Sequence, residues 1–158
     1  MHRLCGLGIL LLCASAGNPA LAAEDFIAVI VGASSPIIDY DTQTLREVFL
    51  KRITVDDHNV AVVPLNLPPA NTARLAFTAS LWGGQPEDQQ GYWNERYFHG
   101  VTPPYVVLSD EAMLRFVTET PGAIGYVAAC RVDARVRVVA QLPITPALLA
   151  RVRESCGS

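Results

Sequence analysis

The stretch from Val60 to Trp82 constrains the fold most, because it joins a strand, a proline-rich turn and the beginning of a helix. The valines between positions 60 and 63 suit a buried strand, and we expect the prolines from Pro64 onward to end it. Asn71 is the expected N-cap of the helix. A helix that begins after a strand offers free N–H groups and a positive dipole end, so it can hold a small anion. The plainer interpretation, one more turn of an α/β domain, stays open.

Residues 1–22 have the features of a cleaved signal peptide. A positive charge at Arg3 precedes an apolar run from Leu4 to Ala14, and Ala20-Leu21-Ala22 fits the cleavage site. The apolar run is shorter than the about 20 residues that a membrane-spanning helix needs. A lipoprotein signal at Cys13 is disfavoured, because a leucine precedes that cysteine where a small residue is required. The sequence therefore predicts an exported, periplasmic protein.

Residues 23–158 are predicted to form a single domain, because 136 residues are enough for one core and few for two. The full sequence carries 12 basic and 15 acidic residues, a net charge of −3, and loss of Arg3 makes it −4. A mildly acidic chain without a basic run argues against nucleic acid or an anionic membrane as the main partner.

Cys130 and Cys156 are the two cysteines outside the predicted signal peptide. An even number of cysteines in an oxidising compartment favours a disulfide, which would link the last helix to the end of the sheet. The closed loop would contribute roughly 3.5 kcal/mol. Two inert thiols or a reactive pair are the alternatives, although no C-x-x-C spacing supports redox catalysis.

Strand-like and helix-like segments alternate along the whole chain. The expected strands besides the one near Val60 are Phe26–Val31, Tyr105–Leu108, Ala123–Ala128 and an edge strand at Val132–Ala140. Helices are expected to begin at Asp41, Pro86, Ser109 and Pro146. Trp93 and Tyr97, four residues apart, are expected to pack into the core. This alternation predicts an α/β domain with a mixed sheet.

Two other groups of residues contain side chains that can act in catalysis or metal binding. Ser34 or Ser35 with His99 would make a hydrolase, but Pro36 stands where a nucleophile elbow needs glycine. The cluster Asp56-Asp57-His58 contains metal-ligating residue types, but adjacent residues of a turn point apart and no second His or Cys is near. We therefore expect no catalytic residues, no metal and no cofactor.

Three segments of the sequence occur in an order known from one protein family. TLREVFLKR is similar to a helix of the form L..IFLGKI, and YWNERYFHG and VTETPGAIGYV follow it, PGAIGYV being the most specific. The chain from about Phe26 to Ala129 thus resembles the phosphate-binding proteins of bacterial ABC transporters. The resemblance implies one three-layer α/β/α lobe, with a mixed and mostly parallel sheet, of a two-lobed periplasmic binding protein. Small stand-alone relatives are similar to the whole length.

The phosphate-binding loop of that family is R-x-D-G-S-G-T, in which the arginine, serine, glycine and threonine cradle phosphate. Alignment on the helix that follows places Leu67 at the arginine, Pro69 at the aspartate and Asn71 at the serine. Thr72 and Ala73 then occupy the last two positions. Asn71 and Thr72 are the polar residues that this alignment leaves for an anion.

The resemblance implies a non-enzymatic binding module for phosphate or another small oxyanion. Asn71, Thr72 and Arg74 are the candidate ligand-binding residues, through the helix N-terminus and one guanidinium. The alternative is an interaction or sensory accessory module that has lost anion binding and docks on a membrane or signalling protein. Tyr92 or Tyr105 would then be an anchor. One lobe alone would need a dimer or a partner to close its cleft.

Overall fold

The computed structural model describes residues 25–157, so the predicted signal peptide lies outside the described residues. The described strands form one five-stranded sheet in the order β3-β2-β4-β1-β5. Their bounds are β1 Phe26–Gly32, β2 Val63–Asn66, β3 Tyr105–Val106, β4 Ala123–Ala128 and β5 Val136–Pro143. β2 pairs in parallel with β3 and β4, whereas β1 pairs antiparallel with β4 and β5. Four strands therefore point one way and β1 the other, so the predicted mixed, mostly parallel sheet is confirmed.

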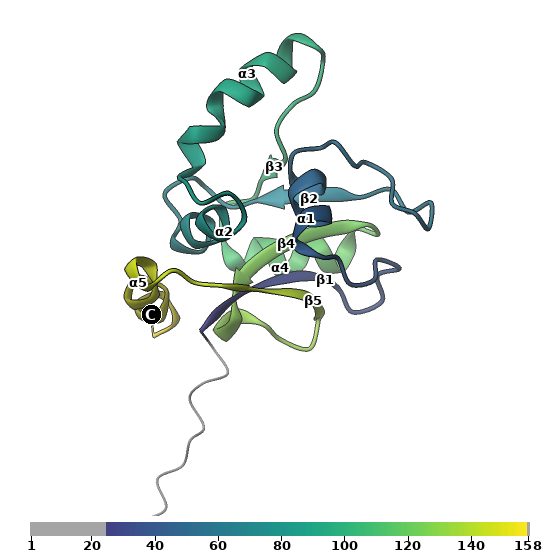
Figure 1. Cartoon of the computed structure of the whole chain (residues 1–158). Coiled ribbons are helices and arrows are strands. Elements are labelled where there is room, and N and C mark those ends of the chain that lie inside the picture. The colour runs from purple at the N-terminus through teal and green to yellow at the C-terminus, as the bar shows by residue number, and fades with distance from the viewer. Residues whose placement is uncertain (1–24, 158) are drawn as a thin grey trace, which may run out of the picture.

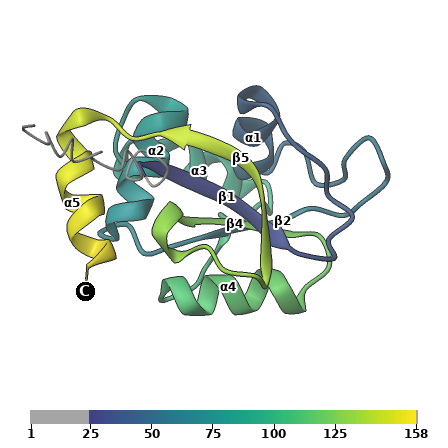
Figure 2. The same ribbon diagram turned by 90° about the horizontal axis from the view of Figure 1, so that it is seen from below.

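Helices cover both faces of the sheet and make the three layers that we predicted. The helical segments are α1 Thr42–Phe49, α2 Thr72–Trp82, η1 Pro86–Gln89, α3 Gln90–Phe98, α4 Asp110–Glu119, η2 Ala129–Arg131 and α5 Pro146–Cys156. Figure 2 shows α4 on one side of the sheet and α1 and α2 on the other, with α5 beside α2. No helix within residues 25–157 has the length and apolar character to cross a membrane.

The core is built around β1 and β4, which are buried along nearly their whole length. The ring of Phe77 in α2 packs against those of Tyr126 in β4 and Phe49 in α1, with centroid distances of 3.7 Å and 4.7 Å. Because aromatic side chains bury large areas, this stack fixes α1 and α2 against the centre of the sheet.

The second strand differs from its prediction, because Pro64 lies inside β2 and does not end it. Successive residues of a strand turn their backbone groups to opposite sides, so residues two apart turn them to the same side. The Asn66 carbonyl accepts from Val107 N on the β3 side. Pro64 therefore faces the same side, one residue before pairing with β3 begins at Leu65. A missing N–H has no cost there.

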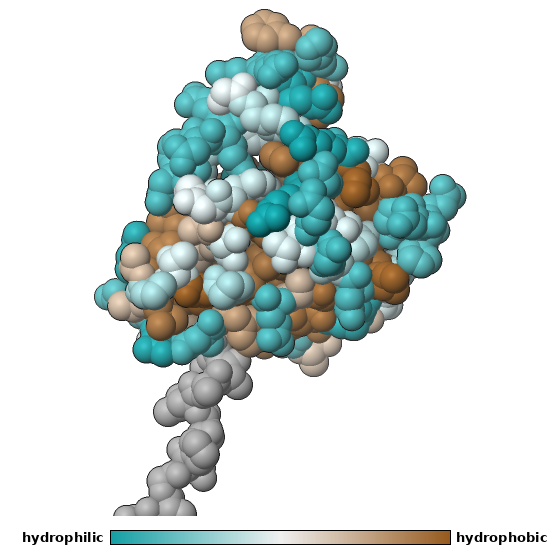
Figure 3. Space-filling model, in the orientation of Figure 1, coloured by the Kyte–Doolittle hydropathy of each residue, from teal (hydrophilic) through white to brown (hydrophobic). Residues whose placement is uncertain are grey.

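α3 forms an arm that stands away from the sheet (Figure 1). The prediction that Trp93 and Tyr97 pack into the core was wrong, because α3 contains no buried residue and Tyr97 is 66% exposed. Phe98 at the end of the arm is 86% exposed. Figure 3 shows that the part of the surface over this arm is mostly hydrophilic. The spacing of the aromatic residues correctly predicted a helix but did not show that this helix is exposed.

Candidate functional site at the carboxyl edge of the parallel strands

The helix that we expected after the proline-rich turn begins where predicted. Asn71 is the N-cap of α2, and its side-chain oxygen accepts hydrogen bonds from Ala73 N at 2.8 Å and Arg74 N at 3.3 Å. The Asn71 carbonyl accepts from Leu75 N at 3.0 Å. Asn71 thus uses three of the first backbone donors of α2 and leaves the N–H of Thr72 unused.

The positive ends of two helices meet at one edge of the sheet. β2 and β3 are parallel, and each is followed within a few residues by a helix, α2 and α4 respectively. The N-termini of both helices therefore lie at the carboxyl edge, which is the usual ligand edge of an open α/β sheet.

Arg74, one of the predicted ligand residues, is buried: its side chain turns inward and only 8% of the residue is exposed. Its Nη1 donates to the Tyr126 hydroxyl at 3.4 Å, while its Nε has no hydrogen-bond partner. No ion pair joins it to a carboxylate in residues 25–157. Since a guanidinium stays charged, this is a buried cation without a matching anion.

The Tyr126 hydroxyl is fully used and holds the site together. It donates to Asn66 Oδ1 at 3.2 Å and accepts from Leu67 N at 3.2 Å as well as from Arg74. One donor and two acceptor positions are all that a hydroxyl offers. Burial raises the pKa of Tyr126, so the hydroxyl stays neutral and cannot supply the charge that Arg74 lacks.

Asp110, the first residue of α4, is the acidic residue whose charge acts on the Tyr126 hydroxyl. Burial raises the pKa of Asp110, and the neighbouring Arg131, whose Nε is 3.8 Å from Oδ2, opposes that shift. Its charge also contributes to the raised pKa of Tyr126, and its Oδ1 has no hydrogen-bond partner. A helix beginning at Ser109 was predicted from the sequence, but the neighbourhood of Asp110 to Tyr126 depends on long-range packing.

The three candidate ligand residues share the first turn of α2 but face different environments. Asn71 and Thr72 are half-buried, whereas Arg74 is buried under the turn. Asn66 and Tyr126 complete the cluster, and neither was predicted from the sequence to have a role. A tyrosine in an otherwise small and apolar strand was the signal for Tyr126, since a buried hydroxyl needs partners.

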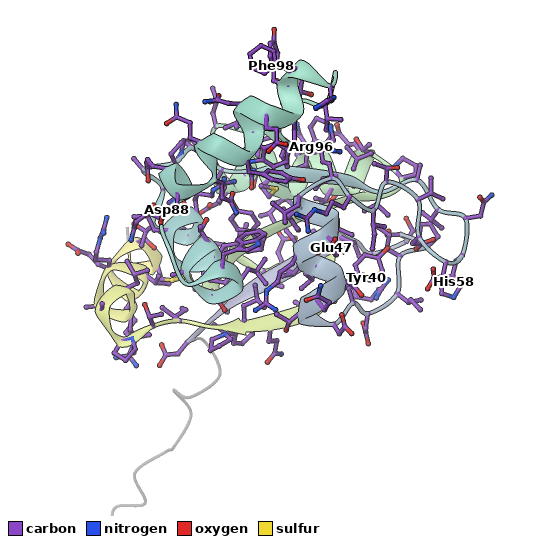
Figure 4. The ribbon with its side chains drawn as sticks, turned by 45° about the horizontal axis from the view of Figure 1, so that its top comes forward. Tyr40, Glu47, His58, Asp88, Arg96 and Phe98 are labelled. Atoms are coloured by element: carbon purple, nitrogen blue, oxygen red, sulfur yellow. A yellow bond between two sulfur atoms is a disulfide. The ribbon has the colours of Figure 1, made fainter. Side chains whose placement is uncertain are left out.

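The candidate residues for catalysis and for metal binding do not lie together in a site. Ser35 Oγ accepts from Ile37 N at 3.3 Å, and His99 is the exposed C-cap residue of α3. Asp56 Oδ1 accepts from the N–H groups of His58 and Val60, both at 2.9 Å, and His58 points outward (Figure 4). The described residues contain no group of three or more His, Cys, Asp or Glu that could hold a metal.

The predicted disulfide between Cys130 and Cys156 is present, with its Cα atoms 6.0 Å apart. It joins η2, which directly follows β4, to the last residue of α5. The carboxyl edge is therefore fixed covalently to the C-terminal helix.

Comparison with known proteins shows similarity in fold alone. No protein-family model and no curated protein matches the sequence. An ABC-type phosphate transport receptor from Vibrio cholerae superposes with a TM-score of 0.59 and 14% identity, over 86% of this chain and 64% of that one. A putative phosphate ABC transporter substrate-binding protein with bound phosphate from Clostridium perfringens gives 0.60 and 16%, over 85% and 61%.

A third similar structure, PstS from Borrelia burgdorferi, has a TM-score of 0.50 and 15% identity, over 66% of this chain and 41% of that one. The chain thus spans less than two thirds of the length of each of these proteins. The fold implied by the sequence resemblance is confirmed.

Proposed function

We propose that this chain is an exported, non-enzymatic binding module of the periplasm that holds a small oxyanion, such as phosphate, at the carboxyl edge of β2 and β4. The buried guanidinium of Arg74 carries this proposal. Removing a cation from water without an opposite charge is costly, and the same group becomes favourable when an anion enters beside it. The fold, which the chain shares with two-lobed phosphate-binding proteins, supports the same conclusion.

The expected contacts come from three neighbouring residues. Arg74 has an unused Nε, and the backbone N–H of Thr72 is the first-turn donor that Asn71 leaves unused. A tetrahedral oxyanion beside this turn would accept charge-assisted hydrogen bonds from the guanidinium and interact with the positive end of α2. The Asn71 side chain already occupies two donors, so the anion binds beside the cap.

Calorimetric titration with phosphate and with sulfate tests the proposal. The protein without its signal peptide should bind at least one of the two anions, and Arg74→Met should remove most of that affinity. Arg115→Met is the matched control, because Arg115 lies on α4 with its side chain 72% exposed. Full retention of affinity in Arg74→Met, or no binding of either anion by a folded wild-type protein, would contradict the proposal.

A second function, docking on another protein, is favoured by one observation. Tyr105 and Leu108 are 66% and 83% exposed beside a surface pocket of about 290 Å³ between β3 and α4. Tyr92 is not such an anchor, because it is half-buried and its hydroxyl donates to the Leu50 carbonyl at 2.8 Å.

Site-specific photocrosslinking in cells separates this second function from the first. A photoreactive residue at position 108 should form a defined protein adduct, whereas the same residue at position 58, on the exposed turn, should not. Equal labelling at both positions would exclude specific docking through Leu108.

A further inference from the structure

The opposite end of α2 forms a second concave site, unrelated to the anion cluster. A pocket of about 340 Å³ lies between the last turn of α2, the glycines that follow it and η1. Its walls include Leu50 and Tyr92, which give it an apolar side. In Figure 4, Asp88 marks the base of the α3 arm, where this pocket lies. Its size suits a small organic molecule.

Three buried polar atoms without hydrogen-bond partners belong to residues that line this pocket. They are Thr78 Oγ1, Trp82 Nε1 and Gln89 Nε2, half of the six such side-chain atoms found in residues 25–157. Thr78 is only 1% exposed, although a threonine in a helix can satisfy its hydroxyl on the preceding turn. Partnerless buried groups are uncommon, so three around one pocket indicate a missing hydrogen-bonding group.

The chemistry of the lining restricts what that group can be. An indole N–H and an amide NH₂ are donors, and a hydroxyl can donate as well, so the ligand must present an acceptor. Asp88 is the only charged residue among those lining the pocket, and its Oδ2 accepts from Gln85 N at 2.7 Å. An anionic ligand would be repelled by this carboxylate and would find no cation in the lining.

We propose that this pocket binds an uncharged small molecule with a flat apolar body and a carbonyl-type acceptor. The apolar body packs against Leu50 and Tyr92, and the carbonyl oxygen accepts from Trp82 and from Thr78 or Gln89. The three polar atoms are closed to solvent in the free protein. The Gln89 side chain makes no hydrogen bond within the described residues and is half-buried, so it is the group that reorients to admit the ligand.

The chain has two tryptophans, so two indole N–H signals in a ¹⁵N-labelled sample report on the site. Trp93→Phe assigns them. Titration with benzamide should shift the Trp82 signal saturably and leave that of Trp93 nearly unchanged. Benzoate, which matches benzamide in shape but carries a negative charge, should bind about fivefold more weakly or worse because of Asp88. An ordered water as the only occupant would give no saturable shift and would overturn the proposal.

Two variants test the polar contacts. Thr78→Val keeps the side-chain shape, and Gln89→Leu removes an amide near the surface. At least one of the two variants should weaken benzamide binding about fivefold, the effect of losing one neutral hydrogen bond. The Gln89 variant keeps the test valid if the Thr78 variant folds poorly. Ser80→Ala, which removes a hydroxyl from α2 outside the lining, is the control. Unchanged affinity in both Thr78→Val and Gln89→Leu, or equal affinity for benzoate, would overturn the proposal.

Discussion

The ring of Phe77 stacks on that of Tyr126 with 3.7 Å between centroids and 6° between planes. This contact links the core to the candidate site, because it fixes the ring whose hydroxyl holds Asn66, Leu67 and Arg74. The orientation of the buried guanidinium therefore depends on packing in the middle of the sheet.

Tyr126→Phe should keep this stack and remove the hydroxyl. Leu67 N, Asn66 Oδ1 and the guanidinium of Arg74 then each lose a partner, so we expect the free energy of unfolding to fall by about 1–3 kcal/mol. Urea denaturation measures it. Tyr105→Phe, which removes an exposed hydroxyl, should change it little, and similar losses in both variants would show that the Tyr126 network has no special role.

Asn71→Asp separates capping from anion binding. Aspartate caps a helix as well as asparagine does, so stability should stay within about 0.5 kcal/mol of wild type. The added negative charge at the first turn should nevertheless weaken phosphate binding at least severalfold by repulsion. Denaturation and calorimetry measure the two effects, and undiminished phosphate affinity would place the anion away from this turn.

Reduction of the Cys130–Cys156 disulfide should destabilise the protein. The bond closes a loop with a sequence separation of 26 residues, for which chain entropy gives about 3.5 kcal/mol. Urea midpoints with and without a reductant measure the loss, with the Cys130→Ser/Cys156→Ser double variant as the reference that reductant leaves unchanged. A wild-type midpoint insensitive to reductant, with full reduction verified, would contradict this expectation.

The contributions of Asp110 and Asp41 to the free energy of unfolding should change with pH in opposite directions. Burial raises the folded-state pKa of Asp110, so its contribution to stability falls as pH rises from its ordinary value of 3.8 through the higher folded value. The backbone N–H of Thr44 lowers the pKa of Asp41, so its contribution is present above that ordinary value and is lost as pH falls below it.

Urea denaturation at pH 3 and pH 7 compares the corresponding asparagine variants with wild type. On going from pH 3 to pH 7, the free energy of unfolding of Asp110→Asn should rise relative to that of wild type. The free energy of unfolding of Asp41→Asn should fall relative to that of wild type. Parallel pH profiles for the two variants would refute the opposite assignments.

Features with local causes were predictable from the sequence. The cap at Asn71 and the strand Ala123–Ala128 were confirmed, because side-chain capping and apolar runs act over a few residues. The burial of Arg74 was not predictable, since it depends on the register that brings Tyr126 of β4 beside β2. The position of Trp93 outside the core was not predicted either, because helical spacing does not show whether another part of the chain packs against that face of the helix.

The short strand β3 forms one border of the sheet, and such a border can recruit foreign strands into aggregates. Pro103 and Pro104 stand immediately before it, and neither has an N–H to offer an incoming backbone. Because β3 has only two residues, an added strand could form few backbone hydrogen bonds with it, which opposes fibril growth from this side. The side chain of Tyr105 nevertheless stays exposed.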